Sequence, residues 1–209
     1  MAVLHRAELK PTKLELLAAW LPGRRWLEGP ADAIERVSSF RFDDPAGAVG
    51  IETILVRAGD GPVYQVPLTY RDAPLTAADR WLLGTTDHSV LGQRWVYDGC
   101  GDPVYAQALA LAIVAGTGQA EQFVETGGRL EPRDPDMTVA GSGVRDAAVP
   151  TVDAIEDGTD ADPTLIRTGP AELAVIRRLD PTAARLGATL TGTWPGQPAP
   201  VVLAYASLP

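Results

Sequence analysis

The sequence predicts an α+β fold centred on an antiparallel sheet. Two runs rich in β-branched and aromatic residues, 50–57 and 63–70, flank a Gly-, Asp- and Pro-rich cluster. This pattern is typical of a β-hairpin, because glycine adopts the positive φ angles that a tight turn needs. A third strand is expected at 93–98. A helix then begins where Asp102 can cap the first turn and Pro103 stands at N1, where a missing N–H costs nothing.

The second run of the hairpin alternates strictly. Tyr64, Val66, Leu68 and Tyr70 fall on one face, which predicts a strand with a buried side. Pro67 cannot donate to a β-ladder, so we expect this strand to lie at an edge of the sheet or to break there.

The other elements before residue 116 follow from periodicity and breakers. Residues 3–9 are compatible with a short strand, and 33–42 with a longer one. Apolar residues recur at helical spacing in 12–21, and a Pro-Gly pair ends that helix. A short helix is expected at 77–83. We expect the helices at 12–21 and 103–115 to pack on one face of the sheet.

The composition changes after residue 126. Residues 127–163 are rich in Gly, Pro, Asp and Ala and have few large apolar side chains, which predicts a weakly structured linker. β-rich runs return after Thr164, with turns between them, and predict a small antiparallel sheet: 164–167, 172–179, 189–193 and 201–207. The predicted division is an α+β domain at 1–126, a linker at 127–163 and a β segment at 164–209.

Charge and composition exclude several classes of partner. The 209 residues carry a formal net charge of −9, with a pI near 4.7, so the chain is acidic and would repel a nucleic-acid backbone or an anionic membrane. No apolar run approaches the ~20 residues of a membrane span, and residues 1–6 lack the apolar core of a signal peptide. We therefore expect a cytoplasmic protein.

Motifs for chemistry are scarce. The two histidines, His5 and His88, lack a metal-binding context, and no nucleophile elbow or Walker A loop occurs, so we expect no catalytic residue, no metal and no cofactor. Cys100, the single cysteine, is expected to be structural. One candidate interaction site remains at Arg24, Arg25 and Trp26, where arginine forks could seat an anion or a partner's carboxylates. The alternative is two solvated arginines beside a core tryptophan.

Several short motifs resemble, in order, the N-terminal cap of actinobacterial maltokinases and of trehalose synthase–maltokinase fusions. These motifs are Trp20-Leu-Pro-Gly-Arg-Arg-Trp26, Tyr64-Gln-Val-Pro-Leu68, Trp95-Val-Tyr-Asp98 and Asp102-Pro103 with its helix. The resemblance covers roughly residues 15–115. It implies a curved antiparallel sheet with packed helices, placed before a kinase of the aminoglycoside-phosphotransferase-like class.

The tail resembles the opening strands of that kinase's small lobe. There the family has a lysine that holds ATP phosphates, and the matching position here is Ala174. The chain has only two lysines, Lys10 and Lys13, and no histidine follows His88 to form a catalytic loop. Because phosphoryl transfer needs positioned positive charge, metal ligands and a base, the resemblance implies a relative without kinase activity.

Three functions remain open. The first is a non-catalytic protein-interaction or regulatory module, linked to trehalose, maltose or glycogen metabolism. The second is a module that binds a small molecule, a sugar or a nucleotide, on the concave face of the sheet. The third is an enzyme of unknown type, or one half of a split sugar kinase that a second chain completes. The sequence favours the first and leaves the oligomeric state open.

Overall fold

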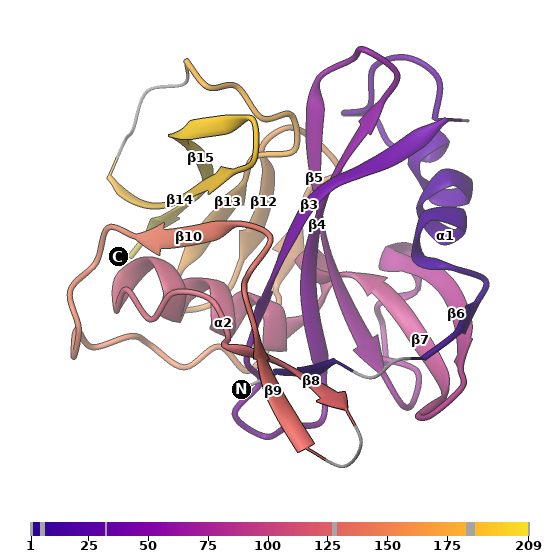
Figure 1. Cartoon of the computed structure of the whole chain (residues 1–209). Helices are drawn as coiled ribbons and strands as arrows, with labels where there is room; N and C mark the ends of the chain where they lie inside the picture. The colour runs from indigo at the N-terminus through magenta and orange to yellow at the C-terminus, as the bar shows by residue number, and fades with distance from the viewer. Residues whose placement is uncertain (1, 5–6, 32, 127–128, 183–186, 209) are drawn as a thin grey trace.

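The computed structural model describes residues 2–4, 7–31, 33–126, 129–182 and 187–208. Three sheets and two α-helices, α1 (Lys13–Trp20) and α2 (Pro103–Val114), make up the fold. No helix in these ranges is long and apolar enough to cross a membrane. The predicted α+β class is confirmed, with mostly antiparallel strand pairing (Figure 1).

The central sheet has six strands in the order β2-β6-β7-β5-β4-β3 and is curled. Its strands are β2 (Leu9–Lys10), β3 (Ile34–Phe42), β4 (Gly50–Ala58), β5 (Val63–Arg71), β6 (Leu82–His88) and β7 (Gly92–Asp98). The predicted hairpin is β4 and β5, in which Ile54 pairs with Val66. Of the short helix expected at 77–83, only one 3₁₀ turn forms, Asp79–Trp81, and β6 follows it.

The two helices lie on opposite faces of the central sheet, so the expectation that they share one face is wrong. Leu17 of α1 belongs to a core with Ile54 and Val66, whereas Leu109 of α2 belongs to a core with Leu55. The physical reason is that β4 and β5 carry buried side chains on both faces, and each face needs a cover. Figure 1 shows α1 on the side of the sheet away from α2.

Pro67 marks a change of strand partner within the sheet. β5 lies between β4 and β7, so the expected edge position is wrong. Pairing with β7 begins at Leu68, however, and on the same side Gln65 receives its partner from another segment, since its N–H donates to the Arg177 carbonyl at 2.9 Å. Pro67 therefore occupies the gap between two partners, where no donor is needed.

The C-terminal sheet has six strands in the order β10-β14-β15-β13-β12-β11. These strands are β10 (Thr138–Gly141), β11 (Asp157–Gly158), β12 (Thr164–Arg167), β13 (Glu172–Val175), β14 (Ala188–Trp194) and β15 (Gln197–Ser207). The antiparallel strands predicted after Thr164 are confirmed. α2 packs between this sheet and the central sheet.

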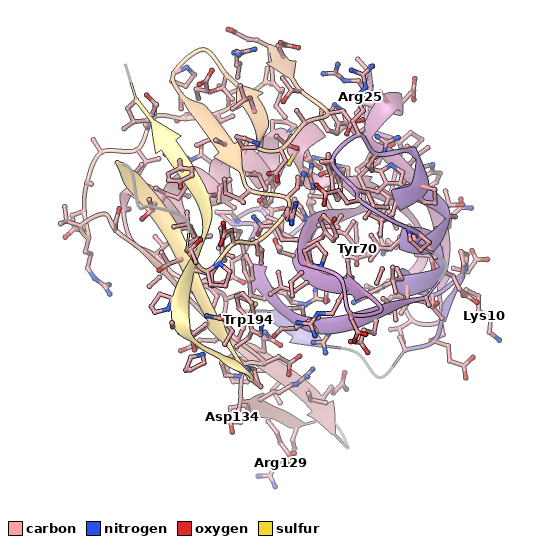
Figure 2. All side chains as sticks on the ribbon, turned by 90° about the horizontal axis from the view of Figure 1, so that it is seen from above. Lys10, Arg25, Tyr70, Arg129, Asp134 and Trp194 are labelled. Carbon is pink, nitrogen blue, oxygen red and sulfur yellow. The ribbon has the colours of Figure 1, made fainter. Side chains whose placement is uncertain are left out.

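A small third sheet consists of β1 (Ala2–Leu4), β8 (Gln122–Thr126) and β9 (Arg129–Arg133). Its β1 pairs with β8 in parallel, and β8 with β9 antiparallel. The end of this sheet that carries Arg129 projects from the body, as the labelled side chains show (Figure 2).

Residues 127–163, for which the composition predicts a linker, hold β10, β11 and, from Arg129, β9. Within this segment Gly141 and Gly143 run directly against α2. A Cβ on either glycine would lie 1.8 Å from a helix carbonyl oxygen, that of Ala112 or Val114, and the Gly143 N–H donates to the Ile113 carbonyl at 2.9 Å. Glycine is therefore required for this close approach.

Candidate functional site

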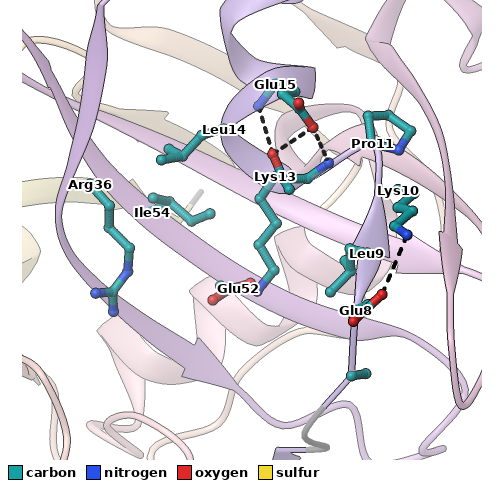
Figure 3. Close-up of a pocket in the computed structure, with 12 residues that line it drawn as sticks. Glu8, Leu9, Lys10, Pro11, Lys13, Leu14, Glu15, Arg36, Glu52 and Ile54 are labelled. Carbon is teal, nitrogen blue, oxygen red and sulfur yellow. Dashed lines mark hydrogen bonds and ion pairs between the residues drawn. The ribbon is translucent and has the colours of Figure 1, made fainter.

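The face of the central sheet that carries α1 is divided into an apolar half and a polar half. α1 covers the apolar half with Leu16, Leu17 and Trp20. The polar half stays open as a cleft of about 740 Å³, between the sheet and the residues around Ala7 and Leu9. A second hollow of about 1090 Å³ adjoins it and shares several of its lining residues (Figure 3). We take this joined cleft as the candidate functional site.

Glu52 on β4 lies on the floor of the cleft and is 5% exposed. Its Oε2 accepts from the Lys13 Nζ at 2.5 Å and from the Tyr70 hydroxyl at 3.0 Å, and an Arg41 nitrogen lies 3.1 Å away in an ion pair. Lys13 stands in the first turn of α1 and extends down to Glu52, as Figure 3 shows. The helix start is fixed by a capping box between Thr12 and Glu15, so α1 carries Lys13 to a defined place.

The protonation states of this cluster follow from its surroundings. Burial alone would raise the pKa of Glu52, but Arg41 and Lys13 lower it to about 2, so the carboxylate is ionised at neutral pH. Burial lowers the pKa of Lys13, although Glu52 opposes this effect. Burial and, after it, the charge of Glu52 raise the pKa of Tyr70 well above its usual value. Tyr70 therefore stays a hydrogen-bond donor.

Cationic side chains surround the Glu52 cluster. In the part of the cleft of about 740 Å³, five of them stand against three carboxylates, although the whole chain is acidic. The cations are Lys13, Arg36, Arg41, Arg94 and Arg133, and the carboxylates are Glu52, Asp43 and Asp44. Asp44 is occupied locally, since its oxygens accept from the backbone N–H groups of Ala46, Ala48 and Val49. Cationic side chains therefore outnumber carboxylates in this part of the cleft.

The predicted site at Arg24, Arg25 and Trp26 lies just after the 3₁₀ turn Leu21–Gly23 and outside the cleft around Glu52. Trp26 is buried against Trp20 and Tyr64, with ring centroids 6.1 and 5.9 Å apart. Arg24 stacks on the Trp20 ring and lies 3.6 Å from an Asp160 carboxylate oxygen. Arg25 is exposed at the surface (Figure 2) and forms no ion pair with the described residues. The three residues are thus neighbours with different surroundings, and their role in binding stays a prediction.

A second buried carboxylate, Asp98, lies at the end of β7 and is sealed in the interior. Its Oδ2 accepts from the Arg177 guanidinium at 2.6 Å, and the two side chains are 1% and 0% exposed. Arg177 also donates through Nε to the Thr164 hydroxyl at 2.7 Å and stacks on the Trp26 ring. Burial would lower the pKa of Arg177, but Asp98 raises it above its usual value. This pair joins the C-terminal sheet to the central sheet.

The sequence analysis missed Glu52 and Arg41. A signal exists, because Glu52 is the single charged residue within the otherwise uncharged run Gly50–Val56, and a charge inside a buried strand needs a partner. The sequence does not identify the partners of Glu52. Arg41 comes beside it through the pairing of β3 with β4, and Lys13 through the position of α1. Among the described residues, no group of three or more His, Cys, Asp or Glu side chains could hold a metal ion.

Cys100 is buried, and burial raises the pKa of its thiol well above the usual value. A thiol that is protonated and inaccessible is a poor nucleophile, which agrees with the predicted structural role.

Comparison with known proteins adds one family. A search of curated proteins finds no match to the chain. Residues 20–102, which run from the end of α1 to the N-cap of α2 and include most of the central sheet, match the family model of the maltokinase N-terminal cap domain and confirm the resemblance over this part of the chain.

Proposed function

We propose that the protein is a non-catalytic interaction module of the maltokinase-cap type, and that its partner is a protein of trehalose, maltose or glycogen metabolism. The observation that carries the proposal is the state of the cations in the part of the chain that resembles a kinase small lobe. They are either absent from the expected place or already engaged in ion pairs.

If the tail corresponds to a kinase small lobe, as its resemblance implies, Ala174 on β13 stands where those kinases keep the lysine that holds ATP phosphates. Its neighbours across the ladder are Leu165 and Tyr205. The next cation along the chain, Arg177, is fully buried against Asp98, and Arg178 is paired with Glu28 at 2.8 Å. A buried guanidinium that holds a carboxylate cannot turn to a nucleotide without breaking that pair, so neither arginine replaces the lysine.

The two lysines of the chain also lie away from the C-terminal sheet, where a lysine that holds ATP phosphates would be needed. Lys10 lies on β2, and Lys13 is engaged with Glu52, both at the central sheet and not at the C-terminal one. Phosphoryl transfer depends on positive charge that converges with metal ligands on one cleft. The arrangement of lysines and arginines therefore supports a role in binding.

Two measurements test the absence of catalysis. Isothermal titration of the protein with Mg·ATP is expected to give no binding in the micromolar range. A phosphotransfer assay with maltose and with glucosamine as acceptors is expected to give no turnover. Turnover by the purified chain, or micromolar Mg·ATP affinity that the variant Arg41→Met retains, would contradict the proposal.

The proposed binding to a partner protein is tested by affinity capture from cells with the wild-type protein and the variant Arg25→Glu. Arg25 is exposed, so its reversal changes the surface and leaves the core intact. We expect an enzyme of carbohydrate metabolism to be captured by the wild type and lost with the variant. Capture that is the same for both proteins would rule out Arg25 as part of the interface.

A second candidate function, small-molecule binding, is favoured by the cleft around Glu52. Ligand sites are concave, of a few hundred to about 1,000 Å³, with a few convergent polar groups. The cleft of about 740 Å³ with its ionised floor fits this description.

A further inference from the structure

We propose that the cleft around Glu52 binds a small molecule that carries at least two phosphate or carboxylate groups, held by Arg41 and Arg94. The inference deepens the small-molecule candidate and assigns a ligand class and binding residues to a surface that neither the sequence nor the family match assigns.

Arg41 has unused donors that lie at the cleft. It is on β3 with a side chain that is 18% exposed, and among the described residues its guanidinium contacts one carboxylate, that of Glu52. A guanidinium has five N–H donors in a planar fork, so most of those of Arg41 remain available to a ligand. A phosphate or carboxylate matches this fork with two parallel hydrogen bonds.

Arg94 offers a second cation on the same floor. One of its terminal nitrogens donates to the Leu91 carbonyl at 2.6 Å, which fixes the side chain against the β6–β7 turn. Its Nε is buried and has no hydrogen-bond partner among the described residues. The Nε is shielded from the cleft, so the terminal nitrogens of Arg94 are the donors that a ligand oxygen can reach.

Glu52 holds the cationic side chains of the cleft floor in position. Its single negative charge faces two positive charges, so the floor stays cationic. Its Oε2 receives Lys13, Arg41 and Tyr70, so one carboxylate holds two cations and a hydroxyl donor in place before a ligand arrives. Such preorganisation lowers the ordering cost of binding. At the rim, Arg36 and Arg133 share Asp136, so their charges are partly balanced.

The positions of the two arginines define the ligand. β7 and β3 are separated by β5 and β4 in the sheet, and the row of paired residues from Arg41 runs through Glu52 and Leu68 to Asp98, four residues from Arg94. Three strand spacings of about 4.8 Å and four residues of about 3.3 Å each place the two arginine backbones roughly 20 Å apart along the sheet. Side chains that reach inward from both strands leave room for a molecule with anionic groups at two ends.

The test is a calorimetric titration at constant ionic strength with four probes, without nucleotide, Mg²⁺ or a partner protein. Tripolyphosphate and citrate carry several anionic groups of the two chemistries, and orthophosphate and acetate carry one. We expect 1:1 saturable binding of tripolyphosphate or citrate, at least tenfold tighter than that of the single-group probe of the same chemistry. Whichever of tripolyphosphate and citrate binds tighter shows whether the ligand carries phosphate or carboxylate groups.

Variants place the site. Arg41→Met and Arg94→Met are each expected to weaken the affinity at least tenfold, and Arg41→Lys, which keeps the charge and loses the fork, to weaken it less. Arg145→Met, which removes an exposed arginine outside the cleft, is the matched control and is expected to stay within twofold. The Nε–Hε signals of Arg41 and Arg94 in ¹H–¹⁵N spectra should shift with the probe, which gives a readout in the unmutated protein.

Three outcomes would overturn the proposal. They are the absence of saturable binding, equal loss in the Arg145→Met control, and arginine signals that do not move at saturation. Because the titration contains no nucleotide, its result stands whether or not the phosphotransfer assays support the proposed function.

Discussion

Asp98 and Glu52 are two buried carboxylates on the same face of the central sheet, and they have opposite surroundings. Asp98 is closed in by Arg177, which also contacts the Thr164 hydroxyl, the Cys100 sulfur and the Trp26 ring. Glu52 lies at the floor of an open cleft, and its partners Lys13 and Arg41 are 29% and 18% exposed. Both carboxylates are paired, but only the second pair keeps contact with solvent.

The difference shows how a buried ion pair can serve structure or binding. A pair whose partners are both sealed can only hold elements together, because neither charge can be rehydrated when the other is lost. A pair at a cleft has cations with spare donors, and a ligand can use them. We therefore expect changes at the Asp98 pair to affect stability most, and changes at the Glu52 cluster to affect binding most.

The largest effect is expected for Arg177→Met, which leaves Asp98 buried without its partner. Loss of one partner of a sealed pair costs about 4 kcal/mol in the free energy of unfolding, measured by urea denaturation. Arg178→Met is the matched control, because Arg178 and Glu28 are 48% and 65% exposed and such a pair contributes less than about 1 kcal/mol. Equal losses for the two variants would show that Arg177 has no special structural role.

An intermediate effect is expected for Asp102→Ala. Asp102 caps α2 by accepting from the Val104 N–H at 2.9 Å, and it also holds Arg71 through two hydrogen bonds of 2.7 Å. The cap alone is worth about 1 kcal/mol, and the buried pair raises the expected loss to about 3 kcal/mol. Asp102→Asn, which retains a capping oxygen and loses the charge, should recover about 1 kcal/mol of it. Denaturant melts that place both variants within error of the wild type would exclude this double role.

A smaller effect is expected for Glu52→Gln, about 2 kcal/mol at pH 7, because Lys13 and Arg41 can turn to water in the cleft. The pKa of Glu52 is lowered to about 2 in the folded protein, below its ordinary value of 4.5. Its stabilisation is therefore present above about pH 4.5 and is lost as the pH falls through about 2. Melts at pH 7, 4 and 2 should show the variant and the wild type converging at low pH. A difference that does not shrink would place the effect outside the ionisation of Glu52.

The sequence predicted those parts of the fold whose signal is local. The β4–β5 hairpin follows from strict alternation around a glycine-rich turn, and the start of α2 follows from Asp102 and Pro103. The stripe of α1 and the antiparallel strands after Thr164 carry the same kind of signal. In each case the pattern of a few adjacent residues decides the element.

The features that the sequence did not predict depend on distant residues. β6 was missed because Gly84-Thr-Thr-Asp-His88 has little apolar character and is paired from both sides, with β2 and β7. From the sequence, Gly141 and Gly143 look like linker glycines. Glycine is needed at both positions because each lies directly against the α2 backbone. The Glu52 cluster needs three elements, and the Asp98–Arg177 pair spans 79 positions of the chain. The division at 127–163 stays a prediction.

The separation between a structural pair and a binding cluster is tested most directly by one comparison of unfolding free energies. Arg177→Met and Arg41→Met are each unfolded in urea, with and without tripolyphosphate at ten times the wild-type dissociation constant, which should stabilise the wild type by about 1.4 kcal/mol. We predict that Arg177→Met loses baseline stability and keeps this gain, and that Arg41→Met loses about 1 kcal/mol or less and abolishes the gain. A full gain in Arg41→Met, or equal loss of both quantities in the two variants, would contradict the separation.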